Sequence, residues 1–288
     1  MKERENLIYT CIDDYGLGYK HNEKIRKIVK TGLISGVTTF VGMKNFHKEA
    51  SALLEISNIT NFQIGLHLDF TNFFPFIQKP SLLDSDSFCA LFIAFNDLNI
   101  LKGASIRDTI FYQLEIFSKS FGRPPDFIDG HYHLHQTSLP IKSLLSILEE
   151  KNFQGWVRTT CMDSYLNHLS SNISLVNKIK IRYLNRLGRK AKKAISNKFR
   201  TNDNFIGYTD LNSNNAYLKK LSQQLELVKS PTLFMLHPGS SEDEVQIDSH
   251  DSKTRDLETE WLLGDFERKC SILNLNIIKD FNYLWIKA

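Results

Sequence analysis

Short apolar runs alternate with amphipathic helical patterns along this chain, and the alternation constrains its fold more than any other feature. The run at 7–13 precedes a helical pattern at 21–32, in which Ile25, Ile28 and Val29 share a face. Further runs lie at 36–41, 62–70, 126–129, 155–160, 232–236 and 275–280, with helical patterns at 46–56, 105–121, 141–151, 215–228 and 255–270 between them. A strand followed by a helix, repeated at least six times, predicts a mostly parallel sheet. This number of units favours an α/β fold that is (β/α) barrel-like, whether closed or distorted and incomplete, over an open doubly wound sheet.

Size and composition are those of one globular domain. The chain has 288 residues, of which 42% are hydrophobic and 24% charged, so it can bury a large core and is neither disordered nor fibrous. We expect a single domain over residues 1–288. Its apolar runs are too short for a signal peptide or a membrane span, and its four cysteines lie without paired spacing, which is typical of a reducing compartment. The expected location is therefore the cytoplasm.

Polar residues stand where the expected strands end. Asp13 and Asp14 end the first run, His67 ends the third, residues 129–135 follow the fourth, Arg158 ends another, and His237 follows the run at 232–236. In parallel α/β folds, catalytic and binding residues collect at the carboxyl ends of the strands. These side chains should therefore converge on one mouth of the fold.

Three of the nine histidines fall within the stretch FIDGHYHLHQ. His131, His133 and His135 alternate, so in an extended segment their imidazoles would lie close together on one side. Such a cluster favours metal binding over packing. A lone strand histidine such as His67 is more often a hydrogen-bonded core residue, and an Asp-Asp pair is often a solvated loop or a helix cap. Each residue alone therefore leaves both interpretations open.

Together the residues suit metal-assisted hydrolysis. One carboxylate and two imidazoles are a common ligand set that leaves room for water and substrate, and Asp14, His67 and His131 can supply it. Asp13 can then accept a proton from the attacking water, and His237 can protonate a leaving amine. Arg158 can orient Asp13, bind substrate or form a structural ion pair.

Four segments, taken together, resemble the YdjC-like carbohydrate deacetylases, whose members include chitooligosaccharide deacetylases and hopanoid-biosynthesis-associated proteins. The segments are IDDYGLGYKHN near the N-terminus, IGLHLDFT at 64–71, FIDGHYHLH at 127–135 and MLHPG at 235–239, with weaker similarity in PSLLDSDSF, NDNFIGYTD and TRDLETEWL. The resemblance implies a barrel-like deacetylase that hydrolyses the N-acetyl group of an amino sugar, oligosaccharide or glycoconjugate with one divalent ion, Mg²⁺ or Zn²⁺.

Site roles also follow from this resemblance. It implies Asp13 as the base and Asp14, His67 and His131 as ligands, which leaves His133 and His135 facing the surroundings of the ion or the substrate. Asp129 would orient an imidazole. Three positions depart from the family pattern: Tyr15 replaces a usual phenylalanine, Gly18 replaces a common serine, and Asp69 replaces a frequent asparagine. The extra carboxylate of Asp69 could bind the ion, raise the pKa of a neighbour or contact the substrate.

Two further segments stand outside these motifs. Residues 177–200 form a basic amphipathic pattern, because residues 178–200 contain ten Lys and Arg and no acid, with Ile181, Leu184 and Ile195 at helical spacing. This expected helical insertion either packs on the barrel or a second subunit, or makes weak contact with an anionic surface; without interleaved aromatics, specific nucleic-acid binding is not expected. The Phe-rich stretch from Phe70 to Phe95 is either core or a sugar-binding lid.

Two other functions use the same residues. A different carbohydrate amide or ester would be hydrolysed by the same base, acid and ion. A non-catalytic sugar- or metabolite-binding protein would keep the pocket, although it would need neither a base nor an acid. A homo-oligomer is compatible with each of these functions.

Overall fold

Eight parallel strands form the centre of the computed structural model, which describes residues 6–70, 103–162, 175–208, 216–228, 230–243 and 252–283. The strand order is β5-β4-β3-β2-β1-β7-β6, and β8 pairs with β1. The strands are β1 (Leu7–Tyr15), β2 (Gly36–Thr39), β3 (Gln63–Leu68), β4 (Phe127–Gly130), β5 (Trp156–Val157), β6 (Asn204–Ile206), β7 (Thr232–Leu236) and β8 (Asn276–Ile277). The expected parallel, barrel-like α/β fold is confirmed.

The two edges of this sheet approach each other. The Val157 N–H at the end of β5 donates to the Arg200 carbonyl at 3.0 Å, and the Thr159 N–H donates to Asn202 Oδ1 at 2.8 Å. Both acceptors lie just before β6, at the opposite edge of the strand order. The barrel is therefore nearly closed, although β5 and β6 are short.

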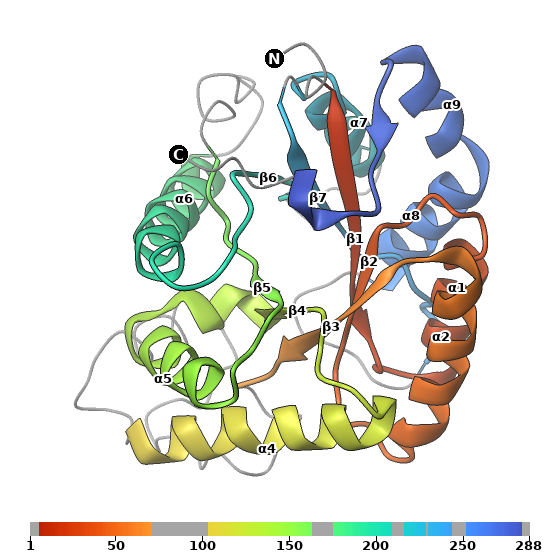
Figure 1. Ribbon diagram of the computed structural model, residues 1–288. Coiled ribbons are helices and arrows are strands. Elements are labelled where there is room, and N and C mark those ends of the chain that lie inside the picture. The colour runs from red at the N-terminus through yellow and green to blue at the C-terminus, as the bar shows by residue number, and fades with distance from the viewer. Residues whose placement is uncertain are drawn as a thin grey trace.

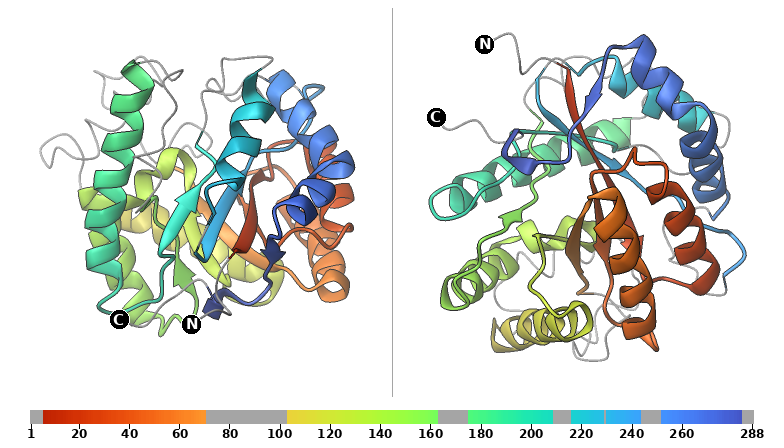
Figure 2. Two further views of the ribbon diagram at one scale, coloured as in Figure 1. Left: turned by 90° about the horizontal axis from the view of Figure 1, so that it is seen from above. Right: turned by 45° about the vertical axis from the view of Figure 1, so that its right-hand side comes forward.

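Helices surround the sheet on the outside. In Figure 1, α1 and α2 lie on one side of the strands, α5 and α6 on the other, and α4 runs across the bottom; the view from above in Figure 2 shows the strands enclosed by helices. The helices are α1 (Tyr19–Val29), α2 (Phe46–Thr60), α4 (Gly103–Phe121), α5 (Ser138–Glu150), α6 (Leu175–Ile195), α7 (Tyr217–Leu225), α8 (Ser252–Gly264) and α9 (Phe266–Ile272), with 3₁₀ turns η2 (His131–Gln136) and η5 (Phe281–Tyr283). None of the described helices is long and apolar enough to cross a bilayer.

Several expected elements differ in extent. The short strand β6 was not expected, the run at 155–160 forms a strand only at Trp156–Val157, and the helix expected at 255–270 is two helices, α8 and α9. The basic amphipathic segment is α6, and its apolar residues Ile181, Leu184, Leu187, Ala191 and Ile195 are buried. Except for buried Phe70, the Phe-rich stretch and the PSLLDSDSF segment lie outside the described residues.

Aromatic rings fill the barrel interior near the amino ends of the strands. Phe127 and Trp156 stack with centroids 4.3 Å apart, and Trp156 stacks on Phe281 at 3.8 Å. Tyr9 meets all three rings edge-on, although β1 is not adjacent to β4 or β5. A Cβ on Gly65 would lie 2.7 Å from the Phe127 ring, so the glycine of the IGLH segment is there for space. This aromatic layer fills the barrel at the amino ends of the strands, so a site can form only at their carboxyl ends.

Candidate metal centre

Every second residue of a strand faces the barrel interior, so a layer of polar side chains follows the aromatic layer toward the carboxyl ends of the strands. Two or four residues after Tyr9, Gly65, Phe127 and Trp156 of the lower layer stand Asp13 on β1, His67 on β3, Asp129 on β4 and Arg158 just after β5. All four are at most 2% exposed, and they contact one another across the barrel. The expected convergence of strand-end residues therefore occurs, and it occurs inside the barrel at the carboxyl ends of its strands.

Asp14 joins this layer through an unusual backbone conformation. In an extended strand its carboxylate would point away from that of Asp13. Asp14 instead has φ +69°, and the register of β1 against β2 shifts between Ile12 and Tyr15. A left-handed non-glycine residue costs about 1–3 kcal/mol, which the surrounding structure must offset. The bend brings both carboxylates to the same mouth.

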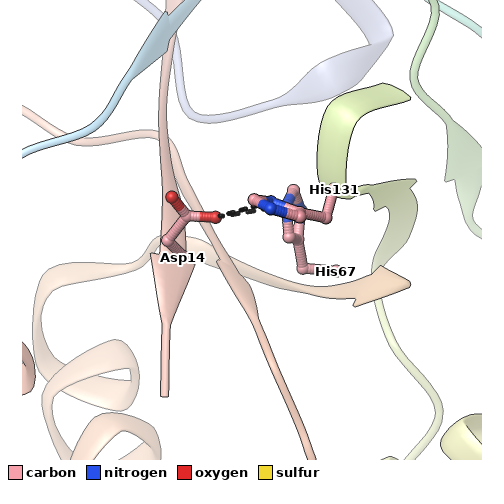
Figure 3. A group of neighbouring side chains, drawn as sticks. All are labelled: Asp14, His67 and His131. Carbon is pink, nitrogen blue, oxygen red and sulfur yellow. Dashed lines mark ion pairs between the residues drawn. The ribbon is translucent and has the colours of Figure 1, made fainter. Parts of the chain in front are cut away.

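Asp14, His67 and His131 form a group that can hold a metal ion. Asp14 Oδ1 lies 3.3 Å from His67 Nε2 and 3.7 Å from His131 Nδ1, and one ligand atom of each residue lies within 4.8 Å of the others. Figure 3 shows the carboxylate pointing from β1 toward both rings, with His131 entering from η2. Phe40 lies edge-on against both imidazoles, with centroids at 4.7 and 5.4 Å.

The donor set fits a divalent cation. Asp14 Oδ1 is buried and has no hydrogen-bond donor of standard geometry among the described residues; it faces only the imidazole nitrogens of His67 and His131, at 3.3 and 3.7 Å. A buried carboxylate oxygen without a donor is costly unless a proton or a cation is shared there. Burial alone would raise the pKa of Asp14, but Arg255 and the imidazoles of His131 and His67 hold it well below its usual value. Asp14 is therefore ionised and ready to bind a cation.

Asp129 fixes the orientation of the His67 ring. His67 Nδ1 lies 2.6 Å from Asp129 Oδ1, and Thr38 Oγ1 lies 3.1 Å from the same nitrogen. With Nδ1–H donated to the carboxylate, the Nε2 lone pair faces Asp14, as in carboxylate–histidine–metal arrangements. Burial lowers the pKa of His67, but Asp129 and Asp14 outweigh it and raise the pKa to about 10. Without an ion, the ring therefore holds a proton on Nε2.

Arg158 pairs with the carboxylates of Asp13 and Asp129. Its Nη1 and Nη2 donate to the two Asp13 oxygens at 2.6 and 2.7 Å, and Nη1 lies 2.8 Å from Asp129 Oδ2. Burial would raise the pKa of Asp13, but the guanidinium keeps it below its usual value. A second group of potential ligands, Cys11, Asp13 and Asp129, surrounds the same guanidinium. These three residues therefore surround a guanidinium rather than a metal ion, and the two hydrogen bonds from Arg158 orient the Asp13 carboxylate.

His237 stands beside Asp13, at the end of β7. Its Nε2 lies 3.9 Å from Asp13 Oδ2, and its backbone N–H donates to Glu258 Oε1 at 2.8 Å. Burial lowers the pKa of His237 to about 4, although both Asp14 and Asp13 act to raise it. The imidazole is therefore neutral near pH 7 and can both accept and return a proton.

The remaining histidines of FIDGHYHLHQ do not lie on one side of an extended segment, and that expectation is wrong. The segment forms the 3₁₀ turn η2, with Tyr132 and His133 in left-handed conformations. His133 is buried edge-on against Phe205, and burial holds its pKa well below the usual value. His135 Nε2–H donates to the Arg158 carbonyl at 2.9 Å, and burial lowers its pKa to about 3. His131 alone of the three meets Asp14 and His67.

Asp69 lies one residue beyond β3 and is fully buried. Its backbone N–H donates to Gln113 Oε1 at 2.9 Å, and its carbonyl accepts from Gln113 Nε2 at 2.8 Å. This double hydrogen bond from α4 fixes the chain where it leaves the third strand. Asp69 does not belong to either group of potential metal ligands among the described residues.

Three residues of the site were not among the predicted site residues. Arg255 Nη2 donates to Asp14 Oδ2 at 2.7 Å, and Glu258 receives the backbone of His237. Both lie on α8, within the TRDLETEWL segment, which resembles the family more weakly than the four main segments do. His21, buried on α1, contacts Gly239 so closely that a Cβ there would lie 2.1 Å from its Nδ1. The glycine of MLHPG therefore makes room for an imidazole.

A carboxylate and two imidazoles that can share an ion, beside an arginine-bound carboxylate and a second histidine, are typical of metal-dependent hydrolases. The chain belongs to the YdjC-like family: the model of that family, described as YdjC-like protein, matches residues 7–270. The family indicated by the four sequence segments is thereby confirmed.

Curated relatives carry the name chitooligosaccharide deacetylase. One from Proteus mirabilis (strain HI4320) is 27% identical over 175 residues, which are 55% of this chain and 68% of the relative. Another from Yersinia pestis (strain Pestoides F) is 28% identical over 137 residues, which are 46% of this chain and 51% of the relative. The matches thus span about half to two thirds of these relatives.

One solved structure shares the whole fold. It is a crystal structure of an Enterococcus faecalis V583 protein to which cellobiose-phosphate cleavage is ascribed, with a TM-score of 0.61. It is 17% identical and covers 98% of this chain and 99% of its own. At this identity, the likeness shows a common fold and no more.

Proposed function

We propose that this protein is a metal-dependent hydrolase that removes the N-acetyl group of an amino sugar, an oligosaccharide or a glycoconjugate. The observation that carries the proposal is the buried group of Asp14, His67 and His131 beside the Arg158-bound carboxylate of Asp13. Membership of the YdjC-like family and the names of the curated relatives support deacetylation over other hydrolyses. Hydrolysis of another carbohydrate amide or ester by the same residues is the alternative.

We propose that Asp14, His67 and His131 hold one divalent ion, Mg²⁺ or Zn²⁺. The two imidazole nitrogens suit Zn²⁺, while a single carboxylate oxygen with several waters suits Mg²⁺. When bound, such an ion polarises the amide carbonyl and lowers the pKa of the attacking water.

Asp13 acts as the base in this scheme. The water oxygen attacks the acetyl carbon, and Asp13 accepts the water proton. Its Oδ1 accepts from Arg158 Nη1, from Thr38 Oγ1 and from the Cys11 thiol, whereas Oδ2 accepts only from Arg158 Nη2 among the described residues and retains a further lone pair. Because the guanidinium keeps the pKa of Asp13 low, the carboxylate does not hold this proton tightly. It can pass the proton on within the same turnover.

His237 acts as the acid. Its Nε2 lies 3.9 Å from Asp13 Oδ2 and it is neutral at rest, so it can receive the proton that Asp13 took from water. The carbon–nitrogen bond then breaks as His237 protonates the amine nitrogen, and a free amino sugar leaves together with acetic acid, which loses its remaining proton to the solvent and becomes acetate. One proton enters from water and one leaves on the amine, so both residues return to their starting states.

Acetate release tests the proposal. The chelated protein would be supplied with Mg²⁺, Zn²⁺, Mn²⁺ or Co²⁺ and given N-acetylated substrates from monosaccharide to chitooligosaccharide, together with nucleotide- and lipid-linked forms. The expected result is metal-dependent acetate release that disappears in Asp13→Asn while ion binding remains. Release of a different product from acylated or esterified sugars would favour the alternative hydrolase. Sugar binding without any turnover would favour a non-catalytic binding protein.

We also propose a single domain over residues 1–288 with the basic helix inserted at 177–200. On α6 the apolar face is buried, while Arg182, Arg186, Lys190 and Lys193 are exposed and make no ion pair within the described part of the chain. This arrangement supports packing on the barrel, with an outer face able to contact an anionic surface weakly. Salt-sensitive sedimentation with anionic but not neutral vesicles, lost in Arg186→Glu, tests that contact.

Within the described part of the chain, Cys11 and Cys270 are thiols outside any disulfide bond. They support the cytoplasm as the proposed location, since that compartment keeps thiols reduced. The proposed partner is the N-acetylated sugar itself, and we propose no specific nucleic acid. Light scattering of the purified chain tests whether a homo-oligomer forms.

A further inference from the structure

The two oxygens of the Asp14 carboxylate face different partners. Oδ1 faces the imidazoles of His67 and His131, whereas Oδ2 accepts a hydrogen bond from Arg255 Nη2 at 2.7 Å. The Arg255 side chain is 6% exposed, so water cannot readily replace this contact. One oxygen is thereby held by a guanidinium while the other is left for a cation.

We propose that Arg255 is a positioning residue that restricts Asp14 to binding the ion through Oδ1 alone. The inference rests on the metal site of the proposed function. Carboxylates bind ions through one oxygen or two, and the choice decides how many positions remain for other ligands. With Oδ2 held by Arg255, the three protein ligands contribute three donor atoms, and the remaining positions stay open for water and substrate.

Helix α8 holds Arg255 in place by contacts with the end of β7. Glu258, one turn further along α8, accepts the His237 backbone N–H at 2.8 Å and the Tyr217 O–H at 2.6 Å. The next residue, Thr259, exchanges hydrogen bonds with the backbone of Gly239, each at 2.9 Å. Residues three and four apart share a helix face, so one face of α8 contacts both the ligand Asp14 and the segment that carries His237.

This arrangement links ion and acid through one rigid element. Burial raises the pKa of Glu258 to about 7, and its two hydrogen bonds and Arg255 act against that rise. Whether Glu258 is protonated or ionised, each of its oxygens has a partner outside α8: the His237 backbone at the end of β7 and the Tyr217 hydroxyl on α7. A shift of α8 would therefore move Asp14 and His237 together.

A purely structural role and the proposed role predict different results for Arg255→Gln. If Arg255 only stabilises a buried carboxylate, its loss should weaken ion binding and leave the ion's geometry unchanged in the protein that remains folded. If it restricts Asp14, its loss removes a positive charge beside the cation and releases Oδ2 to bind. Ion affinity should then stay the same or increase, while the coordination number increases.

Co²⁺ titration of the full chain after chelation separates these outcomes, because the visible absorption of Co²⁺ weakens as its coordination number rises. Arg255→Gln is expected to bind Co²⁺ at least as tightly as the wild type, with weaker absorption per ion and with kcat for acetate release at least tenfold lower. Arg255→Lys keeps a charged donor and should stay closer to the wild-type spectrum. Arg123→Gln, which removes an arginine–carboxylate pair with Asp126 just before β4 at the amino end of the strands, is the matched control and should leave spectrum and affinity unchanged.

A wild-type spectrum in folded Arg255→Gln, at any affinity, overturns the inference. X-ray absorption of the Co²⁺-loaded wild type decides the matter even if the variants do not fold, since a bidentate carboxylate there also overturns it. A wild type that binds Co²⁺ but releases no acetate refutes the proposed deacetylase and leaves both ion readouts valid. A wild type that binds no ion refutes the metal site and the inference together.

Discussion

Replacing Arg158 with methionine tests the electrostatic basis of the site. The guanidinium is fully buried between two carboxylates, with two contacts to Asp13 at 2.6 and 2.7 Å and one to Asp129 at 2.8 Å. Methionine has a similar length and no charge. The variant therefore leaves two buried carboxylates without their shared cation.

The expected loss of stability is about 3–5 kcal/mol at pH 7.5. Two unit charges about 4 Å apart attract by about 4 kcal/mol at an effective dielectric constant of about 20, and Arg158 has two such partners. The desolvation of the guanidinium offsets part of this sum, and removing one partner of a buried pair typically costs about 3–5 kcal/mol. At about 2–4 °C per kcal/mol, the melting temperature should fall by roughly 6–20 °C.

The loss of stability caused by Arg158→Met should also depend on pH, and the surroundings of Asp13 determine whether it grows or shrinks as the pH rises. In the wild type Arg158 keeps the pKa of Asp13 below its usual 3.8, so this carboxylate contributes stability above about pH 4 and loses that contribution as the pH falls further. Without Arg158, burial raises the pKa of Asp13, and the folded variant holds a proton that the unfolded chain releases. The deficit of the variant should therefore be largest near pH 8 and smaller near pH 4.5.

Urea unfolding of both proteins at pH 8 and pH 4.5 provides the measurement. The control is Arg107→Gln, which removes an exposed ion pair with Glu150 and should change the free energy of unfolding by less than about 0.5 kcal/mol. A loss below about 1 kcal/mol in Arg158→Met, or a loss that is the same at both pH values, would refute the reasoning.

Three further predictions concern the base, a glycine and a buried histidine. Asp13→Asn should lower kcat for acetate release by about 10²–10⁴ while the ion Kd changes less than threefold, measured by coupled acetate assay and calorimetry. Gly18→Ala should lower the free energy of unfolding, measured in urea, by about 1–2 kcal/mol, because the added Cβ would lie 2.4 Å from the Asp243 carboxylate. That carboxylate accepts the Lys20 and His21 N–H groups in the first turn of α1. The control is Gly264→Ala, whose Cβ would have no neighbour within 4 Å and which should be nearly neutral. The pKa of His135 is lowered to about 3, so between pH 6.5 and 4 the unfolded chain binds a proton at this residue and the folded chain does not. The wild type should therefore lose stability as the pH falls through this range. His135→Gln should reduce the slope of the free energy of unfolding against pH by the equivalent of about one proton, and an unchanged slope would contradict the prediction.

Strand periodicity explains why much of the site was predictable. Once Tyr9 and Phe127 are assigned to the interior, Asp13 and Asp129 must face the same interior two or four residues later, and they do. The position of His67 on β3 follows from the same rule. Once one interior residue of a strand is known, alternation therefore indicates which polar side chains at the end of that strand face the interior.

Local backbone geometry and distant contacts were not predictable in the same way. Asp14 reaches the site only through its left-handed conformation, and the histidines of η2 separate because that segment is a 3₁₀ turn rather than a strand. Arg255 is 241 positions away from Asp14 in the sequence. Nothing in the spacing of such residues identifies a contact, because tertiary packing alone brings them together.

The charges of the site point to one further measurable consequence. The buried carboxylates of Asp13, Asp14 and Asp129 face two guanidiniums, those of Arg158 and Arg255, so the layer is negative unless a cation is added. Without an ion, His67 supplies that cation as a proton, since its pKa is raised to about 10.

An ion bound to His67 Nε2 must displace this proton. Ion binding at pH 8 should therefore release about one proton, and affinity should rise about tenfold per pH unit between pH 7 and 9. Calorimetry of Co²⁺ binding in buffers with different ionisation enthalpies measures the released protons directly. His67→Gln provides the control, since any binding that remains should release no proton from this position. Proton release near zero in the wild type would show that His67 is already neutral, and that the charge of the layer is balanced by another group.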